Sequence, residues 1–422
     1  MTLVEIMITL VISSIIAAST FMFFAGQQRI YETQTKLLNI QQNLWAAMEV
    51  VARYTRASGS GMYECVQPAS YYNTTAASGQ RLLSTNPSAG PLTTSLTTRP
   101  QAGVRAFDAS TGNMQWIPPL WIINNDTSDA SVNSGTDVLS VAFGNRTSGT
   151  DVDATLLLNV PNTASSTAIT LSGTSTGNMF RLGEFILLLT TPDWGYGSDP
   201  IVDRGCTMFQ ITSDPTGSTT LAHAATAIKP GDVVWNPSGN VAGMLPGGGY
   251  TGGSAGVRNF GQLTWVTFFV QIGANGIPNL MMQQRHLGSA SNSPQVLAEG
   301  IEDFQVSFAC DTGSIANQNL TQLNGTLDEG TDDGTKQSDE WWNNVPNDTL
   351  PPIGTNGFCN LPTAVRLTMV VRTLAPDDLI DTAVTANGPM DVEDHRYAPR
   401  PTDRFRRRVL STTVYPRNNK PL

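Results

Sequence analysis

The stretch Met1-Thr2-Leu3-Val4-Glu5, followed by nineteen residues without charge, proline or glycine up to Phe24, decides the fold of the N-terminal part of this chain. At about 1.5 Å per residue, an α-helix over residues 3–25 covers the ~30 Å hydrocarbon core of a bilayer. A carboxylate in such a helix indicates a functional site, because an unpaired charge in hydrocarbon is costly. The α-amino group at Met1 of a neighbouring copy would neutralise Glu5. The alternative is that Glu5 reaches water at the membrane face.

The helical pattern continues beyond Gly26, which together with the pair Ser13-Ser14 is the weakest point of the expected helix. Apolar residues then recur at spacings of three or four, at Leu37, Ile40, Leu44, Met48 and Val51. This spacing is typical of a helix with one buried face. Because residues 27–57 contain no Pro or Gly, we expect one helix to about Ala57. Its first part, 1–26, would form a membrane or filament core, and its second part, 27–57, would pack on a head domain.

The remainder of the chain contains strand patterns without intervening helical ones, which predicts an α+β fold with an antiparallel sheet laid on the long helix. We divide the head into a loop-rich, β-rich region, 58–262, and a C-terminal sheet region, 263–422. Asn275-Gly276 predicts a hairpin turn between two strands. The expected strands are Asp137–Phe143, Ala154–Val160, Glu184–Thr190, Cys206–Ile211, Leu263–Ile272, Ile277–Leu287, Ile301–Ala309, Ala364–Thr373 and Arg407–Tyr415.

The composition favours an exported protein that does not bind nucleic acid. The net charge is −10 and only 14% of residues are charged, whereas nucleic-acid binders are usually basic. The four cysteines are even in number and lack CxxC spacing, so two disulfides are expected after export. Three pairings exist. We favour Cys310–Cys359, because both border expected strands, and Cys65–Cys206 follows by elimination.

The N-terminal stretch resembles that of type IV pilins and pseudopilins. Three C-terminal segments resemble PilW-type pilins: Val296–Val306, the runs Ala364–Leu367 and Val371–Thr373 of one expected strand, and Arg407–Val414, which is followed by Arg417-Asn418. The resemblance implies a subunit that polymerises into an extracellular filament, with the head as the filament surface. Met1 and Glu5 would act in assembly. The filament-core positions would be Leu3, Val4, Ile6, Leu10, Ile15, Phe21 and Phe24.

The resemblance also implies partners and locations. The subunit would sit in the inner membrane as a single-pass protein before assembly, and in the pilus afterwards, with roles in cell adhesion and motility. Its partners would be other copies, other pilins, a prepilin peptidase and the pilus assembly machinery. That peptidase removes a leader from family precursors and methylates the new N-terminus, usually a Phe. Here position 1 is Met, and we expect it to be the processed end because Glu5 then matches the family position; the alternatives are an initiator Met or an uncleaved signal anchor.

Two alternatives to the filament subunit stay open. One is a minor tip pilin or adhesin that primes assembly, with the middle of the chain as its binding region. The other is a pseudopilin of a type II secretion apparatus, which would form a short periplasmic piston.

Other motifs carry weaker hypotheses. Asp328, Asp332, Asp333 and Asp339 lie in a Gly-bearing acidic stretch that could bind Ca²⁺, although its spacing differs from the EF-hand and such runs are usually solvated. No other cofactor is expected. The GxSxG pattern at 252–256 and the GxGxxG pattern at 247–252 lie in a run of glycines, without the strand and helix that catalytic versions need. We therefore expect a flexible loop there and no enzyme.

A basic cluster marks the C-terminus. On an edge strand, alternate arginines would face water and limit sheet aggregation. The alternative is a contact with the acidic 302–348 region of a neighbouring subunit. The cluster comprises Arg396, Arg400, Arg404, Arg406, Arg407, Arg408, Arg417 and Lys420.

Overall fold

The structure, a computed structural model, describes the long N-terminal helix and most strands of the head. The described residues are 2–62, 71–73, 104–108, 113–117, 119–123, 132–145, 156–157, 168–171, 179–190, 206–229, 234–237, 255–284, 293–309, 341–342, 364–376, 392–393, 395 and 403–416.

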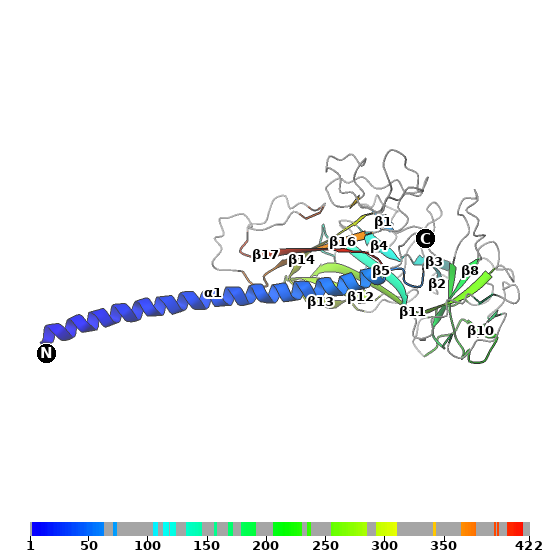
Figure 1. Ribbon diagram of the computed structural model, residues 1–422, viewed down its shortest axis with the longest axis horizontal. Coiled ribbons are helices and arrows are strands. Elements are labelled where there is room, and N and C mark those ends of the chain that lie inside the picture. Colours follow the sequence, from blue (N-terminus) through cyan, green and yellow to red (C-terminus); the bar gives the residue numbers. More distant parts are fainter. Residues whose placement is uncertain are drawn as a thin grey trace, which may run out of the picture.

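A single helix, α1 (Leu3–Ala57), forms the N-terminal part and projects far beyond the head (Figure 1). It is 55 residues long and passes through Gly26 without a break. Its bounds agree with the sequence prediction. Thr2 caps its first turn, and Ser58 and Gly59 end its last.

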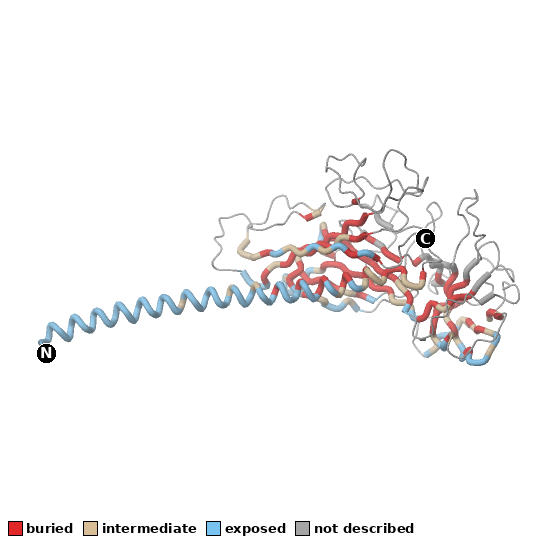
Figure 2. Tube along the Cα trace, viewed as in Figure 1, coloured by how far each residue is buried: buried red, intermediate tan, exposed pale blue. Residues whose placement is uncertain are grey.

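Only the last third of α1 packs on the head. Its buried face carries Ile40, Leu44, Ala47, Met48 and Val51, whereas the side chains before Leu37 are almost all exposed (Figure 2). Packing therefore begins about ten residues later than the predicted start at residue 27. The physical reason lies in the sequence of 27–36, which contains mainly Gln, Thr and charged residues that cannot supply an apolar face.

Two sheets enclose the buried face of α1, and they confirm the predicted α+β class. The first is antiparallel and has the strand order β15-β14-β16-β17. Its strands are β14 (Ile301–Ala309), β15 (Trp341–Trp342), β16 (Ala364–Arg372) and β17 (Arg407–Val414). The second is centred on β11 (Ala255–Ile272), with β5 (Val138–Asn145), β12 (Pro278–Gln284), β13 (Gln295–Glu299), β4 (Leu120–Ile123) and β1 (Tyr71–Asn73) on its helix side.

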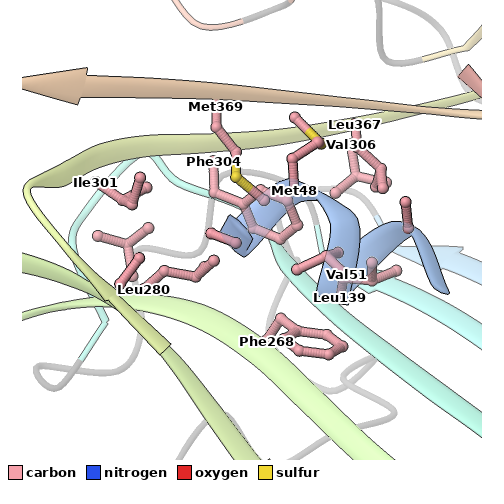
Figure 3. Close-up of a cluster of buried hydrophobic side chains, with 14 of the residues drawn as sticks. Met48, Val51, Leu139, Phe268, Leu280, Ile301, Phe304, Val306, Leu367 and Met369 are labelled. Atoms are coloured by element: carbon pink, nitrogen blue, oxygen red, sulfur yellow. The ribbon is translucent and has the colours of Figure 1, made fainter. Parts of the chain in front are cut away.

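The core between helix and sheets is aliphatic and aromatic. Met48 and Val51 of α1 lie among side chains from both sheets, including Phe304 of β14 and Leu139 of β5 (Figure 3). The side chains of β14 are buried at eight of its nine positions. Burying such side chains supplies the main favourable free energy for docking the helix.

The 18-residue strand β11 links this core to a second one. Its C-terminal half pairs with β5 and β12, and its N-terminal half pairs with β8 (Phe185–Thr190) and β6 (Leu156–Leu157). A bulge at Gly261, with φ +81°, separates the two halves. The strand starts at Ala255 and runs across the predicted boundary at 262/263. Ala255 and Gly256, which were predicted to lie in a loop, are therefore strand residues, because β8 supplies their backbone partners.

We call the strands around the N-terminal half of β11 the outer unit, which lies at the end of the head away from the N-terminus (Figure 1). It contains β8, β6, β9 (Cys206–Gln210), β2 (Val104–Asp108), β3 (Asn113–Ile117) and the two-stranded sheet of β7 (Ala168–Thr170) and β10 (Thr220–Ala222). Its own core includes Phe180, Ile186, Phe209, Leu221 and Val257. The sheets are not wholly antiparallel as predicted, since β1–β4 and β2–β9 pair in parallel.

The end of α1 is joined to β5 beside the bulge in β11. The Gly59 N–H donates to the Ala142 carbonyl at 2.9 Å, and the Gly144 N–H donates to the Ser60 carbonyl at 2.7 Å. Gly144 permits this approach, because a Cβ there would lie 2.5 Å from the carbonyl oxygen of the buried Phe260. Helix, β5 and β11 therefore meet at one tightly packed point.

The predicted turn at Asn275-Gly276 connects β11 and β12. Gly276 has φ +73°, and its N–H donates to the Gly273 carbonyl at 2.9 Å. The Asn275 side-chain oxygen accepts from the Ile277 N–H at 3.0 Å. The structure thus confirms the hairpin, with the turn spanning Gly273–Gly276.

Replacing Leu44 by Ala should destabilise the head strongly. Leu44 is 3% exposed and packs in the core under the sheets, so truncation should lower the free energy of unfolding by about 2–5 kcal/mol. Leu38→Ala is the matched control, since Leu38 is exposed on the same helix and should change stability by no more than about 0.5 kcal/mol. Chemical unfolding in detergent, followed by near-UV circular dichroism, measures both. Equal effects would show that α1 does not pack as described.

The outer unit should lose stability in acid because of His223. This side chain is 1% exposed and lies against Phe209, with ring centroids 4.6 Å apart, and neither ring nitrogen has a hydrogen-bond partner among the described residues. Burial lowers the pKa of His223 from 6.5 to about 4. Between pH 6.5 and pH 4 the imidazole of His223 is therefore protonated in the unfolded chain but neutral in the folded chain. The free energy of unfolding falls over this range, by about 3 kcal/mol in total.

His223→Leu should remove most of this dependence. Melting temperatures of the variant and the parent chain, taken between pH 7 and pH 4, provide the measurement. A parent and a variant with parallel pH profiles would exclude His223 as the cause.

Candidate functional site in the exposed half of helix α1

The first part of α1 presents a continuous apolar surface that the head leaves uncovered. Every large apolar side chain from Leu3 to Phe24 keeps at least half of its surface exposed (Figure 2). The segment is long and apolar enough to cross a membrane, and none of it is buried inside the protein. An exposed apolar surface of this extent marks an interaction site. All predicted filament-core positions lie in it: Leu3, Val4, Ile6, Leu10, Ile15, Phe21 and Phe24.

The hydroxyl groups of this surface are satisfied within the helix. Thr9, Ser13, Ser14, Ser19 and Thr20 each donate to a backbone carbonyl three or four residues earlier, at 2.7–3.0 Å. In hydrocarbon, an unpaired donor would cost several kcal/mol. These five residues therefore do not hinder burial of the segment in lipid or among other helices.

Glu5 is the only charged side chain between Thr2 and Gln28. Its Oε2 accepts a hydrogen bond from the Thr2 N–H at 2.8 Å, and its own N–H donates to Thr2 Oγ1 at 3.4 Å. This reciprocal capping places the carboxylate at the N-terminus of the helix, where the helix dipole favours a negative charge. Oε1 accepts no hydrogen bond from any described residue. Glu5 therefore has one oxygen bound locally and one available to a partner.

The predicted pairing of Glu5 with the α-amino group of another copy stays a prediction. Met1 lies outside the described residues. The capping role of Thr2 was not predicted. A Thr three residues before a Glu at a helix start is a recognisable capping pattern and could have indicated it.

The other predicted sites fall mostly outside the part of the chain that the structure describes. Cys206 is the first residue of β9, but Cys65, Cys310 and Cys359 are not described, so the disulfide pairings stay predictions. The same applies to the proposed calcium ligands Asp328, Asp332, Asp333 and Asp339. Within the described ranges, no group of three or more His, Cys, Asp or Glu side chains could hold a metal ion.

The C-terminal basic cluster requires a correction at Arg407. Its side chain is fully buried, and it donates from Nε to Glu302 at 2.6 Å and from Nη1 to Asp403 at 2.8 Å. Burial would lower the pKa of Arg407, but the hydrogen bonds to Asp403 and Glu302 raise it above its ordinary value. The prediction that this arginine faces water or a neighbouring subunit is wrong, because its acidic partner Glu302 belongs to the same chain.

Two further polar contacts accompany this pair. Arg372 lies 3.8 Å from Glu302 and stacks on the Phe405 ring. Further along β14, the buried Asp303 is 2.7 Å from Nδ1 of His395. No local sequence signal marks these contacts, because their partners lie far apart in the chain. They fix His395 and Phe405, which lie between β16 and β17, to the sheet.

Removing Arg407 should destabilise the head. Arg407→Ala leaves Glu302 and Asp403 without their shared partner, and breaking a buried pair in this way costs about 3–5 kcal/mol. Arg408→Ala changes the neighbouring, exposed arginine and should alter stability by no more than about 0.5 kcal/mol. Denaturant unfolding of both variants tests the assignment. If Arg408→Ala had the larger effect, the pairing of β16 with β17 would need revision.

Comparison with known proteins gives one match. Residues 267–418 match the model of a family described as Type IV Pilus-assembly protein W. A search of curated proteins and of solved structures found no match.

The matched region includes one of the two sheets that enclose α1 and part of the other. It contains the end of β11 together with β12, β13, β14, β15, β16 and β17. The resemblance of the three C-terminal segments to PilW-type pilins is confirmed. The C-terminal third of this chain is similar to proteins of type IV pilus assembly.

Proposed function

We propose that this chain is a type IV pilin, a subunit that polymerises into an extracellular filament through α1. The observation that carries the proposal is the exposed apolar half of α1, joined to a sheet region that is similar to type IV pilus-assembly proteins. The apolar half alone would fit a signal anchor. The matched sheet region packs on the same helix and favours a pilus role over a general anchor.

The physical basis of assembly is the exchange of lipid contacts for helix contacts. Before assembly, residues 3–24 lie in the inner membrane with the head outside it. In the filament, the same side chains pack against other α1 helices, and the head forms the outer surface. Because lipid tails and apolar side chains are similarly apolar, packing and polar pairing supply much of the preference for the filament.

Glu5 would select the axial register of the filament. In an apolar helix core an unpaired carboxylate is costly, and a cation of the adjacent subunit at the same depth removes that cost. A subunit that is displaced along the axis leaves both charges unpaired. The unengaged Oε1 of Glu5 is suited to accept such a bond while Oε2 keeps the cap.

The proposal includes the partners that a pilin requires. They are other pilins, a prepilin peptidase that processes and methylates the N-terminus, and the assembly machinery that extracts subunits from the membrane. The chain would be non-enzymatic.

A tip position with a binding role is a second candidate, and the outer unit favours it. This unit has its own hydrophobic core and lies away from the exposed half of α1 (Figure 1). It is not needed to cover the helix. Immunogold labelling of the head would distinguish the two: labels along the whole shaft indicate a major subunit, and labels confined to the end indicate a tip subunit.

Replacing Glu5 by Ala should abolish or strongly reduce filaments while leaving subunits in the membrane. The test compares sheared surface filaments with membrane-retained protein by immunoblot, in cells that carry the pilus machinery. The expected result is a several-fold loss of filament at an unchanged subunit level, because the variant lacks the carboxylate that would set the axial register of the subunits.

Thr2→Ala is the matched control, since it removes the hydroxyl of the helix cap but keeps the carboxylate. It should cost about 1 kcal/mol of helix stability and leave filaments in place. Normal filament numbers in Glu5→Ala would contradict the register role, and loss in Thr2→Ala alone would assign Glu5 to local capping.

A further inference from the structure

A stripe of large apolar side chains continues along α1 past the membrane-length segment. Phe24, Tyr31, Leu38 and Trp45 follow one another at intervals of seven residues, and they are 65%, 71%, 57% and 64% exposed. A seven-residue step returns to the same side of a helix with a drift of about 20°. The four side chains therefore form a slanted stripe that turns by about 60° from Phe24 to Trp45. Leu10 and Leu3 continue the same register towards the N-terminus, with Ala17 between Leu10 and Phe24.

The stripe faces away from the core of the head. Leu38 precedes the buried Ile40 by two residues, and Trp45 precedes the buried Ala47 by two. Two residues correspond to about 200° around a helix, so each exposed residue points almost opposite to its buried neighbour. The head of the same chain leaves this stripe uncovered.

A membrane does not explain the far end of the stripe. Aromatic residues often anchor a helix at the membrane interface, and Phe24 and Tyr31 fit that role. Leu38 and Trp45, however, lie about 21 and 32 Å beyond Phe24 along the helix axis, at about 1.5 Å per residue. When residues 3–24 span the bilayer, these two side chains are well outside it, beside the head.

The surroundings of the stripe are uncharged between residues 24 and 45. Its neighbours on the helix surface are Gln27, Gln28, Gln34, Thr35 and Gln42. The charged residues Arg29, Glu32 and Lys36 lie at least about 100° around the helix from Tyr31. Glu49 lies one turn beyond Trp45, about 40° around the helix, and its carboxylate is paired with Arg56 at 3.6 Å. Two copies of the stripe can therefore face each other without like-charge repulsion, and the Gln side chains can pair across the contact.

The area suits a contact between copies. An aromatic side chain buries about 150–250 Å² in full, so the exposed fractions of the three aromatics give roughly 600–1,000 Å² over two facing helices. Leu38, together with Leu3 and Leu10, brings the sum into the range of about 1,200–2,000 Å² of a stable interface. A strict seven-residue apolar repeat is also the spacing that keeps one side of a helix turned towards a partner when two helices supercoil.

We propose that this stripe docks on α1 of a second copy of this chain, with the two helices parallel, so that helix contacts continue from the apolar segment to Trp45. The parallel orientation rests on the proposed function, in which both helices enter the membrane with their heads on the same side. The contact would hold the second copy beside the head, on the side of α1 opposite to its buried face.

Site-specific photo-crosslinking in cells that express the full chain tests this. A benzoylphenylalanine is introduced at Leu38 or Trp45, and at Lys36 or Asn43 as matched controls. Each control is exposed and lies two residues away, on nearly the opposite side of the helix. Irradiation should give a product with the mass of two copies at positions 38 and 45, several-fold more than at 36 and 43, in sheared filaments.

The outcomes separate this inference from the proposed function. Filaments that form without crosslinks at 38 and 45 would overturn the stripe while leaving the pilin assignment in place. Crosslinks at these positions in a chain that never forms filaments would support the stripe and contradict the pilin assignment. Crosslinks only to a protein of different mass would overturn the choice of a second copy as the partner.

Discussion

The packing of the last third of α1 between two sheets is the contact on which the rest of the structure depends. The buried face from Ile40 to Val51 fills a core that β14, β16, β5 and β11 complete from both sides (Figure 3). Without the helix, both sheets would expose these apolar side chains. Because α1 packs on the head only from about Leu37 onwards, its first part has no covering from the described residues of its own chain.

This geometry divides one helix into two environments. The part on the head has a single apolar face, and the part before residue 25 is apolar all round, which is typical of a segment buried in lipid or among other helices. Because its hydroxyl groups are hydrogen-bonded within the helix and its N-terminus is capped, the exposed part is compatible with burial in lipid and with burial among other helices. The similarity of residues 267–418 to type IV pilus-assembly proteins includes the sheet of β14 to β17, which packs on α1, so the matched region and α1 form one structural unit.

The sequence predicted those features that short periodic patterns determine. The bounds of α1 and of β14 agree with prediction because a 3.6-residue period and a continuous apolar run are local signals. The strand β4 was missed because its four apolar residues after Pro118 and Pro119 are too few to identify, and they become a strand only through pairing with β5. Arg407 was misplaced because its partner Glu302 is 105 residues away. The functional role of Glu5 stays a prediction from its position, and its hydrogen bond to Thr2 was not predicted.

The junction at Gly144 has a consequence for how such a chain can evolve. The end of α1, strand β5 and the β11 bulge meet there, with Phe260 at the centre, and the space excludes even one additional methyl group. The outer unit, in contrast, has a separate core. The strand β11 joins it to the part of the head that packs on α1. A substitution at this junction would therefore disturb α1, β5 and β11 together, whereas a substitution on the surface of the outer unit leaves the attachment of the helix intact.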